Sequence, residues 1–146
     1  MCVFNVDDLL RFDFELAGKI YVDTNGSVDY NVDNQKFCEK DEQIYAWVID
    51  DEIVYIGMAS KGIKKRLGEH KGGWKGGSKT GLSKASLIRE QHDLNKSILV
   101  YGRKCEYTNV TVEVLGVKKD LKISLVSHEE DMLIQMLQPK WNVNGK

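Results

Sequence analysis

Two pairs of side chains have the types and spacing that proton transfer beside an anion would need. Tyr45 and Tyr55 lie ten residues apart, on two segments whose patterns predict neighbouring strands. Arg66 and His70 are four residues apart, so on a helix they share one face and place a permanent cation beside a possible proton carrier. Tyrosine is common on strands, so the tyrosine pair by itself is more typical of cross-strand packing than of catalysis.

A carboxylate cluster precedes an apolar helical stripe near the end of the sequence. The segment HEEDMLIQMLQPKWN begins with acidic residues and then spaces apolar residues at helical intervals. It predicts a helix from about Ser127 to Gln138, which Pro139, the only proline, ends. Ser127 and Glu130 also match a capping box, in which the Glu130 carboxylate would bind its own helix rather than a ligand.

The basic residues are concentrated in the middle of the sequence. Residues 58–104 hold 12 Lys and Arg against 3 Asp and Glu, whereas residues 1–57 hold 4 against 13 and residues 105–146 hold 5 against 6. The formal net charge of −1 hides this block. Lysine and arginine that neutralise phosphates release counterions, so the block predicts a footprint for a polyanion, although a solvated basic face would have the same composition.

Length and composition indicate one ordinary globular domain. The 146 residues are 42% hydrophobic and 29% charged, and a chain of this length folds without disulfides or metals. Cys2, Cys38 and Cys105 form no CxxC pair, which argues against a disulfide framework or a zinc ribbon and for a reducing compartment. No apolar run approaches the ~20 residues of a membrane span and the start is acidic, so we expect a cytoplasmic protein without a membrane partner.

Alternating apolar residues predict strands in the first third of the sequence. The segment LLRFDFEL, residues 9–16, alternates apolar and polar residues and predicts a half-buried strand. Residues 19–32 alternate around Asn25-Gly26, the strongest short hairpin signal. We therefore expect a small antiparallel sheet in this region.

The remaining sequence contains both strand and helix patterns. Residues 44–49 and 52–57 are apolar and are separated by two aspartates, which predicts a buried hairpin. A helix follows from about residue 61, and the glycine-rich residues 71–82 predict a mobile loop that cannot pack a core. Ser83 is expected to cap the next helix, and SILVYG and NVTVEVLGV predict two more strands.

In their order and spacing these segments resemble the GIY-YIG nuclease family. QIYAWV matches the first motif, IVYIG the second, KKRLGEH the arginine helix, and EDMLIQMLQPKWN the metal helix with its terminal asparagine. The resemblance covers about residues 43–142 and is strongest to the phage and restriction endonuclease branch, where it extends to the NGS hairpin, SKASLI and VYGRKC. It implies an α/β (α+β) fold in which helices flank a small central antiparallel sheet, here with an N-terminal β-hairpin extension.

The resemblance implies a role for each residue of the two pairs. Tyr45 corresponds to the general base for the attacking water, and Tyr55 would line the same pocket. Because a phenol titrates at about 10, Tyr45 needs positive potential nearby to ionise. Arg66 would hold the scissile phosphate, and His70 would hydrogen-bond a phosphate or shuttle a proton. Plain packing of Tyr55 and ordinary surface positions for Arg66 and His70 are the alternatives.

The resemblance also implies a metal site. Glu130 precedes Asn142 by twelve residues, as in the family pattern, and is the expected ligand of one divalent ion, magnesium or alternatively manganese. This register selects Glu130 over its neighbour Glu129. Asn142 would hydrogen-bond the phosphate or the glutamate, and a simple turn after Pro139 is the alternative.

Six cationic or aromatic residues are expected to contact DNA. One of them resembles a lysine that the phage endonuclease branch uses at the phosphate, namely Lys84. Cations beside an aromatic residue in the glycine-rich segment are the combination that a backbone or groove contact requires, although such loops are often merely solvated. The expected DNA-binding residues are Lys65, Lys71, Trp74, Lys75, Lys79 and Lys84.

Three positions depart from the family pattern. Gln43 replaces the glycine of the first motif, and Met58 follows YIG where many relatives carry a polar residue. The step from Tyr55 to Arg66 is eleven residues, one more than usual, with Gly62 as the extra residue. One added residue rotates a helix face by about 100° unless a loop absorbs it, so the direction of Arg66 is left open.

Taken together, the motifs predict a metal-dependent endonuclease that hydrolyses phosphodiester bonds of double-stranded DNA. Residues 1–42 are expected to form a β extension that serves oligomerisation, and residues 43–146 the nuclease domain. One active site nicks one strand, so cutting a duplex suggests a homo-oligomer. A non-catalytic DNA-binding module on the same fold, or a restriction or repair nuclease with another biological role, is the alternative.

Overall fold

The computed structural model describes residues 4–142, in which strands and helices follow one another along the chain. The strands are β1 (Glu15–Val22), β2 (Val28–Val32), β3 (Gln43–Ile49), β4 (Glu52–Ala59), β5 (Ile98–Lys104), β6 (Tyr107–Val114) and β7 (Val117–Ser124). The helices are α1 (Val6–Leu10), α2 (Ile63–Gly72), α3 (Lys79–Asp93) and α4 (Val126–Leu137), with a 3-10 turn η1 (Gln35–Cys38) and a π-helical turn η2 (Gly73–Gly77).

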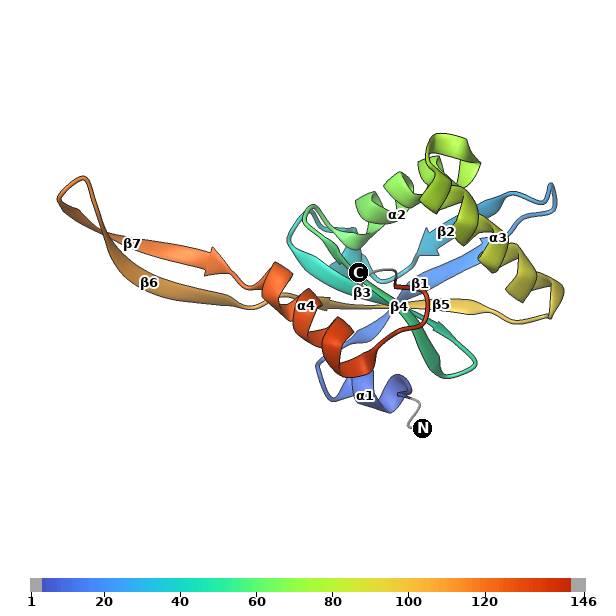
Figure 1. Ribbon diagram of the computed structural model, residues 1–146, viewed down its shortest axis with the longest axis horizontal. Coiled ribbons are helices and arrows are strands. Elements are labelled where there is room, and N and C mark those ends of the chain that lie inside the picture. Colours follow the sequence, from blue (N-terminus) through green and yellow to red (C-terminus); the bar gives the residue numbers. More distant parts are fainter. Residues whose placement is uncertain (1–3, 143–146) are drawn as a thin grey trace.

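Five strands form one antiparallel sheet in the order β2-β1-β5-β3-β4. Figure 1 shows α2 and α3 on one face of this sheet and α4 with α1 on the other. All seven residues of β3 are buried, because its side chains alternate between two apolar cores, with Trp47 on the α2 side and Ile44 on the α4 side. The expected α+β fold with a central antiparallel sheet between helices is confirmed.

The N-terminal hairpin is confirmed, but it is not a sheet of its own. β1 and β2 pair on either side of a turn in which Gly26 has φ +81°. β1 also pairs with β5, so the hairpin is continuous with the five-stranded sheet. The role of residues 1–42 in oligomerisation stays a prediction.

Helix α1 replaces the first part of the strand expected over LLRFDFEL. Asn5 is its N-cap, and the Asp8 carboxylate accepts a hydrogen bond from the Asn5 N–H at 2.9 Å, which completes a capping box. Of the alternating apolar side chains Phe14 is buried, whereas Leu10 and Leu16 are each 51% exposed. The local capping interactions therefore outweigh the alternating pattern.

The glycine-rich segment is helical, not a mobile loop. α2 runs on into η2, where Gly76 with φ +115° breaks the helix, and α3 begins at Lys79. The N-cap of α3 is Ser78 and not Ser83, because the Ser78 hydroxyl accepts from the Gly81 N–H at 2.9 Å. Trp74, in the middle of the segment, is only 2% exposed and anchors it in the core.

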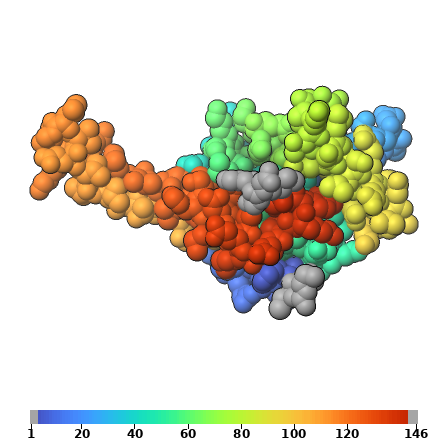
Figure 2. Space-filling view, viewed as in Figure 1, coloured from blue at the N-terminus to red at the C-terminus, as the bar shows by residue number. Residues whose placement is uncertain are grey.

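β6 and β7 form a separate two-stranded sheet that projects from the body as an arm (Figures 1 and 2). The strand expected over residues 109–117 turns at Leu115 and Gly116, whose positive φ values of 52° and 78° suit a two-residue hairpin turn. At its root, the hydroxyls of Ser124 and Tyr107 donate to the Glu42 carboxylate at 2.8 and 3.2 Å.

The end of the described chain covers the open edge of the sheet at β4. α4 lies within one residue of its expected bounds, and the Trp141 N–H then donates to the Val54 carbonyl at 2.8 Å. Covering an edge strand in this way blocks pairing with other chains. Between residues 4 and 142 no helix is long and apolar enough to cross a membrane. Cys38 and Cys105 are free thiols, as expected, and Cys2 lies outside the described residues.

Candidate active site

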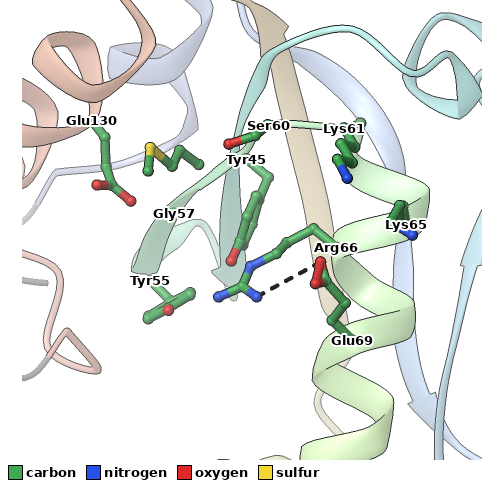
Figure 3. Close-up of a pocket in the computed structure, with 11 residues that line it drawn as sticks. Tyr45, Tyr55, Gly57, Ser60, Lys61, Lys65, Arg66, Glu69 and Glu130 are labelled. Atoms are coloured by element: carbon green, nitrogen blue, oxygen red, sulfur yellow. Dashed lines mark ion pairs between the residues drawn. The ribbon is translucent and has the colours of Figure 1, made fainter.

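Four of the six residues that were expected to be catalytic line one cavity of about 500 Å³, and His70 and Asn142 do not. β3 supplies Tyr45, β4 supplies Tyr55, α2 supplies Arg66 and α4 supplies Glu130. Figure 3 shows these side chains facing one another from elements that are far apart in the sequence. The fold therefore brings the four expected groups together.

Tyr45 fits into this cavity only because a glycine lies opposite it on the neighbouring strand. Tyr45 and Gly57 are partners in the β3–β4 register, and Tyr45 has no exposed surface. A Cβ atom on Gly57 would lie 2.4 Å from the Tyr45 hydroxyl oxygen. The glycine of the YIG motif is thus required by the close approach of the phenol ring.

The Tyr45 hydroxyl lies 2.7 Å from Nε2 of His70 on α2. The His70 ring stacks on Trp74, with ring centroids 6.0 Å apart. Burial raises the pKa of Tyr45 well above its usual range, and it lowers the pKa of His70 to about 3, with a further contribution from the cations of Arg66 and Lys84. At neutral pH the hydrogen bond therefore joins a neutral phenol to a neutral imidazole.

Arg66 points into the cavity, so the additional residue Gly62 has not turned it away. Figure 3 shows the guanidinium beside the phenol oxygen of Tyr45. Its side chain is 40% exposed and pairs with Glu69 at a distance of 3.9 Å. A half-exposed guanidinium with one long ion pair keeps donors that can bind a phosphate.

The neighbouring glutamates of α4 have different surroundings. Glu130 is 8% exposed and lines the cavity on the side opposite Arg66 (Figure 3). Glu129 instead forms an ion pair with the Arg103 guanidinium at 2.7 Å and accepts the Glu106 N–H at 2.7 Å. Glu130 therefore lies at the cavity, whereas Glu129 connects α4 to β5 and to the root of the arm.

The capping-box alternative for Ser127 and Glu130 is wrong. α4 begins at Val126, its N-cap is Leu125, and the Val126 N–H donates to the Ser124 hydroxyl and not to Ser127 or Glu130. Ser127 consequently lies inside the helix, and Glu130 lines the cavity.

Glu130 also fits the requirements of a divalent cation. Magnesium binds through one or two carboxylates and fills its other positions with water and phosphate oxygens. No group of three or more His, Cys, Asp or Glu that could hold an ion occurs in the part of the chain that the structure describes. An ion at this cavity would therefore use Glu130 together with water and substrate oxygens.

A second cavity of about 250 Å³ adjoins the first and shares Tyr55, Arg66 and Glu69 with it. It is lined by Lys84 from α3, which is only 9% exposed and whose Nζ lies 4.8 Å from the centroid of the Tyr55 ring. Burial, and the charge of Arg66, lower the pKa of Lys84. Within residues 4–142 its ammonium has no carboxylate partner, which is unusual for a buried lysine.

The other expected DNA contacts lie in several environments. Lys65 lines the first cavity, and Lys75 and Lys79 are exposed. Lys71 is paired with Asp29 at 3.0 Å, so its ammonium is engaged within the protein. Trp74 is buried behind His70 and cannot reach DNA. Its spacing of four residues from His70, which places both on one helix face, could have indicated this contact.

Asn142 directs both polar atoms of its side chain to the backbone of β4. Its Oδ1 accepts from the Ile56 N–H at 3.0 Å, and its Nδ2 donates to the Ile56 carbonyl at 2.8 Å. The amide thus continues the hydrogen bonding of the sheet edge beside Tyr55, instead of facing a phosphate or Glu130.

Sequence reasoning missed three polar residues of the first cavity. Ser60, Lys61 and Glu69 contribute to its lining. The position of Lys61 in the basic block was a usable signal, whereas nothing in the sequence distinguishes Ser60 or Glu69 from ordinary surface residues.

Comparisons with known proteins support the fold. No family model matches the sequence. A structure of a bacteriophage T4 EndoII mutant matches the fold with a TM-score of 0.71 at 24% identity, over 94% of this chain and 98% of that one. The restriction endonuclease HPY188I in complex with product DNA matches with a TM-score of 0.51 at 20% identity, over 93% of this chain and 86% of that one.

The sequence comparison identifies the family. Over 137 residues the chain is 31% identical to Endonuclease II of Enterobacteria phage T4, and the match spans 93% of this chain and 94% of that protein. An identity of this size over nearly the whole of both sequences shows that the chain belongs to the endonuclease II family.

Proposed function

We propose that this protein is a GIY-YIG-type endonuclease that hydrolyses phosphodiester bonds of double-stranded DNA with the help of a divalent metal ion, magnesium or manganese. The observation that carries the proposal is the convergence of Tyr45, Arg66 and Glu130 on one cavity. The identity to an endonuclease over most of the chain supports a nuclease, and the basic block of residues 58–104 supports DNA as the partner.

In this proposal Tyr45 and His70 act together as the base. Because burial raises the pKa of Tyr45, a free tyrosinate is scarce at neutral pH. The Tyr45 oxygen would accept a proton from the attacking water while its own proton passes across the 2.7 Å hydrogen bond to Nε2 of His70. Burial is the main cause of the low pKa of His70, and a bound phosphate would offset only the smaller contribution from the cations of Arg66 and Lys84, which favours this transfer.

The cations around the two cavities would bind the phosphates. Arg66 lines both cavities, so its planar fork can hold the scissile phosphate and stabilise the charge that develops on it. Lys84 would hold a phosphate oxygen in the second cavity, where it lacks a carboxylate partner among the described residues. Lys65, Lys75 and Lys79 would contact the flanking backbone. Tyr55, between the cavities, would orient the phosphate.

Glu130 would hold the metal ion, which when bound supplies positive charge that stabilises the leaving oxygen. Asn142 would act indirectly, by fixing the β4 edge next to Tyr55.

Incubation of the purified protein with supercoiled plasmid and magnesium tests the proposal. Wild type and Glu90→Gln, an exposed control on α3, are expected to give nicked and then linear product, whereas Glu130→Gln and EDTA-treated wild type are expected to give none. Fluorescence anisotropy with a labelled duplex would measure binding by each variant. If wild type binds the duplex but never cuts with magnesium or manganese, the protein is a DNA-binding module and not a nuclease.

A homo-oligomer and a cytoplasmic site of action, in a bacterial host cell if the protein is phage-encoded, are part of the same proposal. One cavity cuts one strand, so double-strand cleavage calls for at least two protomers. Gel filtration with light scattering tests this assembly, and a monomer at micromolar concentration would count against a stable oligomer.

A further inference from the structure

Gln43, the first residue of β3, joins three segments through one buried amide. It has no exposed surface. Its Oε1 accepts from the Ile63 N–H at 2.9 Å, and the two N–H groups of its Nε2 are shared among three acceptors, namely the carbonyls of Lys36 and Glu39, both at 3.3 Å, and the Asp41 carboxylate. Every polar atom of the side chain is therefore used, and the amide ties the loop before β3 to the start of α2.

The start of α2 depends on this contact because it has no cap of its own. Its N-cap is Gly62, which has no side chain to bind the free N–H groups of the first turn. Gly62 has φ +95°, and a Cβ atom there would lie 2.1 Å from the Glu39 carbonyl oxygen. The backbone at the start of α2 therefore contacts the loop that Gln43 binds. Gln43 also supplies the acceptor for the first N–H of the helix.

Arg66 and His70 follow directly on this anchored turn. The Arg66 N–H donates to the Gly62 carbonyl at 3.1 Å, so Arg66 belongs to the first turn of the helix. His70 lies one turn later on the same face. A shift or rotation at Ile63 is carried along the helix to both side chains.

We propose that Gln43 is a positioning residue, which sets the direction of Arg66 and His70 by anchoring the first turn of α2, and which contacts neither DNA nor metal. The inference rests on the proposed nuclease function for its effect on cleavage. The structural part of the inference is that Gln43 holds His70 against Tyr45, and this part can be measured without a cleavage assay.

The test uses Gln43→Met, which keeps the side-chain length and removes all four hydrogen bonds. The matched control is Leu9→Ala, which removes buried methyl groups from the core on the opposite face of the sheet. Proton and nitrogen NMR would follow the titration of His70, and cleavage assays would give kcat and KM. Thermal unfolding would give the loss of stability in each variant.

In Gln43→Met we expect the pKa of His70 to rise from about 3 toward 6.5, because the ring leaves its buried contact with Tyr45. We also expect kcat to fall at least about tenfold with KM changed by less than about threefold, since a displaced Arg66 loses transition-state contacts while the other cations still bind DNA. Leu9→Ala is expected to lose a comparable amount of stability but to leave both the pKa of His70 and kcat unchanged.

Gly62→Ala provides a second variant if Gln43→Met does not fold, because a Cβ atom there disturbs the same contact with Glu39 while Gln43 is kept. It is expected to show the same two effects. Unchanged His70 titration in a folded variant, or equal changes in Leu9→Ala, would overturn the inference. If wild type does not cleave DNA, the proposed function fails, and the His70 titration still decides whether Gln43 positions the helix.

Discussion

The Tyr45 hydroxyl and Nε2 of His70 lie 2.7 Å apart although 25 residues separate them in the sequence. Both rings pack against Trp47, with ring centroids 6.2 and 5.1 Å from it. Burial acts on the two pKa values in opposite directions, raising that of Tyr45 and lowering that of His70. The fold therefore holds an acid and a base side by side with both uncharged.

This burial predicts that His70 destabilises the folded protein in acid. The pKa of His70 is about 3 in the folded protein and 6.5 in an unperturbed chain, so between these values the unfolded chain binds a proton that the folded protein does not. Stability falls as pH is lowered through this window, by up to ~1.4 kcal/mol per pH unit from this one group, and above the window His70 contributes no pH dependence.

Urea unfolding of wild type and His70→Gln, from about pH 7 to about pH 4, measures this contribution. The variant is expected to lose less stability in acid than wild type does. His92→Gln, which removes an exposed histidine of α3, is the control and should keep the wild-type slope. Equal slopes for wild type and His70→Gln would show that His70 is not buried in its neutral form.

Glu129→Gln is predicted to lower stability and leave catalysis intact. The amide oxygen introduced by the substitution could still accept the Glu106 N–H, but the Arg103 guanidinium, 11% exposed, would lose its close counter-charge and keep only the exposed Glu106 carboxylate at 4.0 Å. Removing one partner of such a pair costs about 3 kcal/mol. Urea unfolding should report this loss while kcat, measured well below the unfolding temperature, stays at the wild-type value.

The double variant Arg103→Met with Glu129→Met separates the ion pair from other effects. An apolar pair of similar volume is expected to recover part of the lost stability, because no buried charge remains unpaired. If Glu129→Gln abolished cleavage at full stability, Glu129 and not Glu130 would be the functional carboxylate of α4.

The candidate cluster could be predicted from the sequence because the resemblance to the family rests on strong local patterns. Tyr45 and Tyr55 lie on two apolar strands around a tight turn, and Arg66 and His70 share one helix face. Each of these patterns depends only on residues that are close together in the sequence. The twelve-residue spacing to Asn142 in the family pattern favours Glu130 over Glu129. The structure agrees, because of these two glutamates only Glu130 lines the cavity.

The sequence did not reveal relationships that depend on packing between distant segments. Trp74 lies in a glycine-rich stretch that resembles a loop, yet close contact between Gly73 and Gly81 lets η2 and α3 fold against each other: a Cβ atom on Gly81 would lie 2.4 Å from the Gly73 backbone. The capping role of Gln43 similarly depends on a residue twenty positions later. The alternation of NVTVEVLGV predicts β6, but β7 and the projection of the arm were missed, because the side chains of β7 are mostly polar and exposed.

Lys84→Met is predicted to lower cleavage without lowering stability. The Lys84 side chain is only 9% exposed, its ammonium lies over Tyr55, and within residues 4–142 it forms no ion pair, so the folded protein bears a desolvation cost that methionine avoids. We expect kcat to fall by about 10²-fold or more, because a charge that would stabilise the transition state is lost. Thermal unfolding should show an unchanged or higher Tm.

Lys118→Met on the exposed arm is the control for Lys84→Met and should keep wild-type cleavage. A large drop in Tm for Lys84→Met would show that this lysine is kept for structure. Unchanged kcat would remove it from the proposed phosphate site.

Asn142→Ala is predicted to act through stability and not through DNA affinity. The substitution removes two hydrogen bonds to the Ile56 backbone, each worth about 1 kcal/mol, so urea unfolding should show a loss of about 2 kcal/mol. Because neither amide atom is directed at a phosphate, the Kd for a labelled duplex should stay within about twofold of wild type at a temperature where both proteins are folded. A large rise in Kd at unchanged stability would instead place Asn142 at the DNA, as the resemblance first implied.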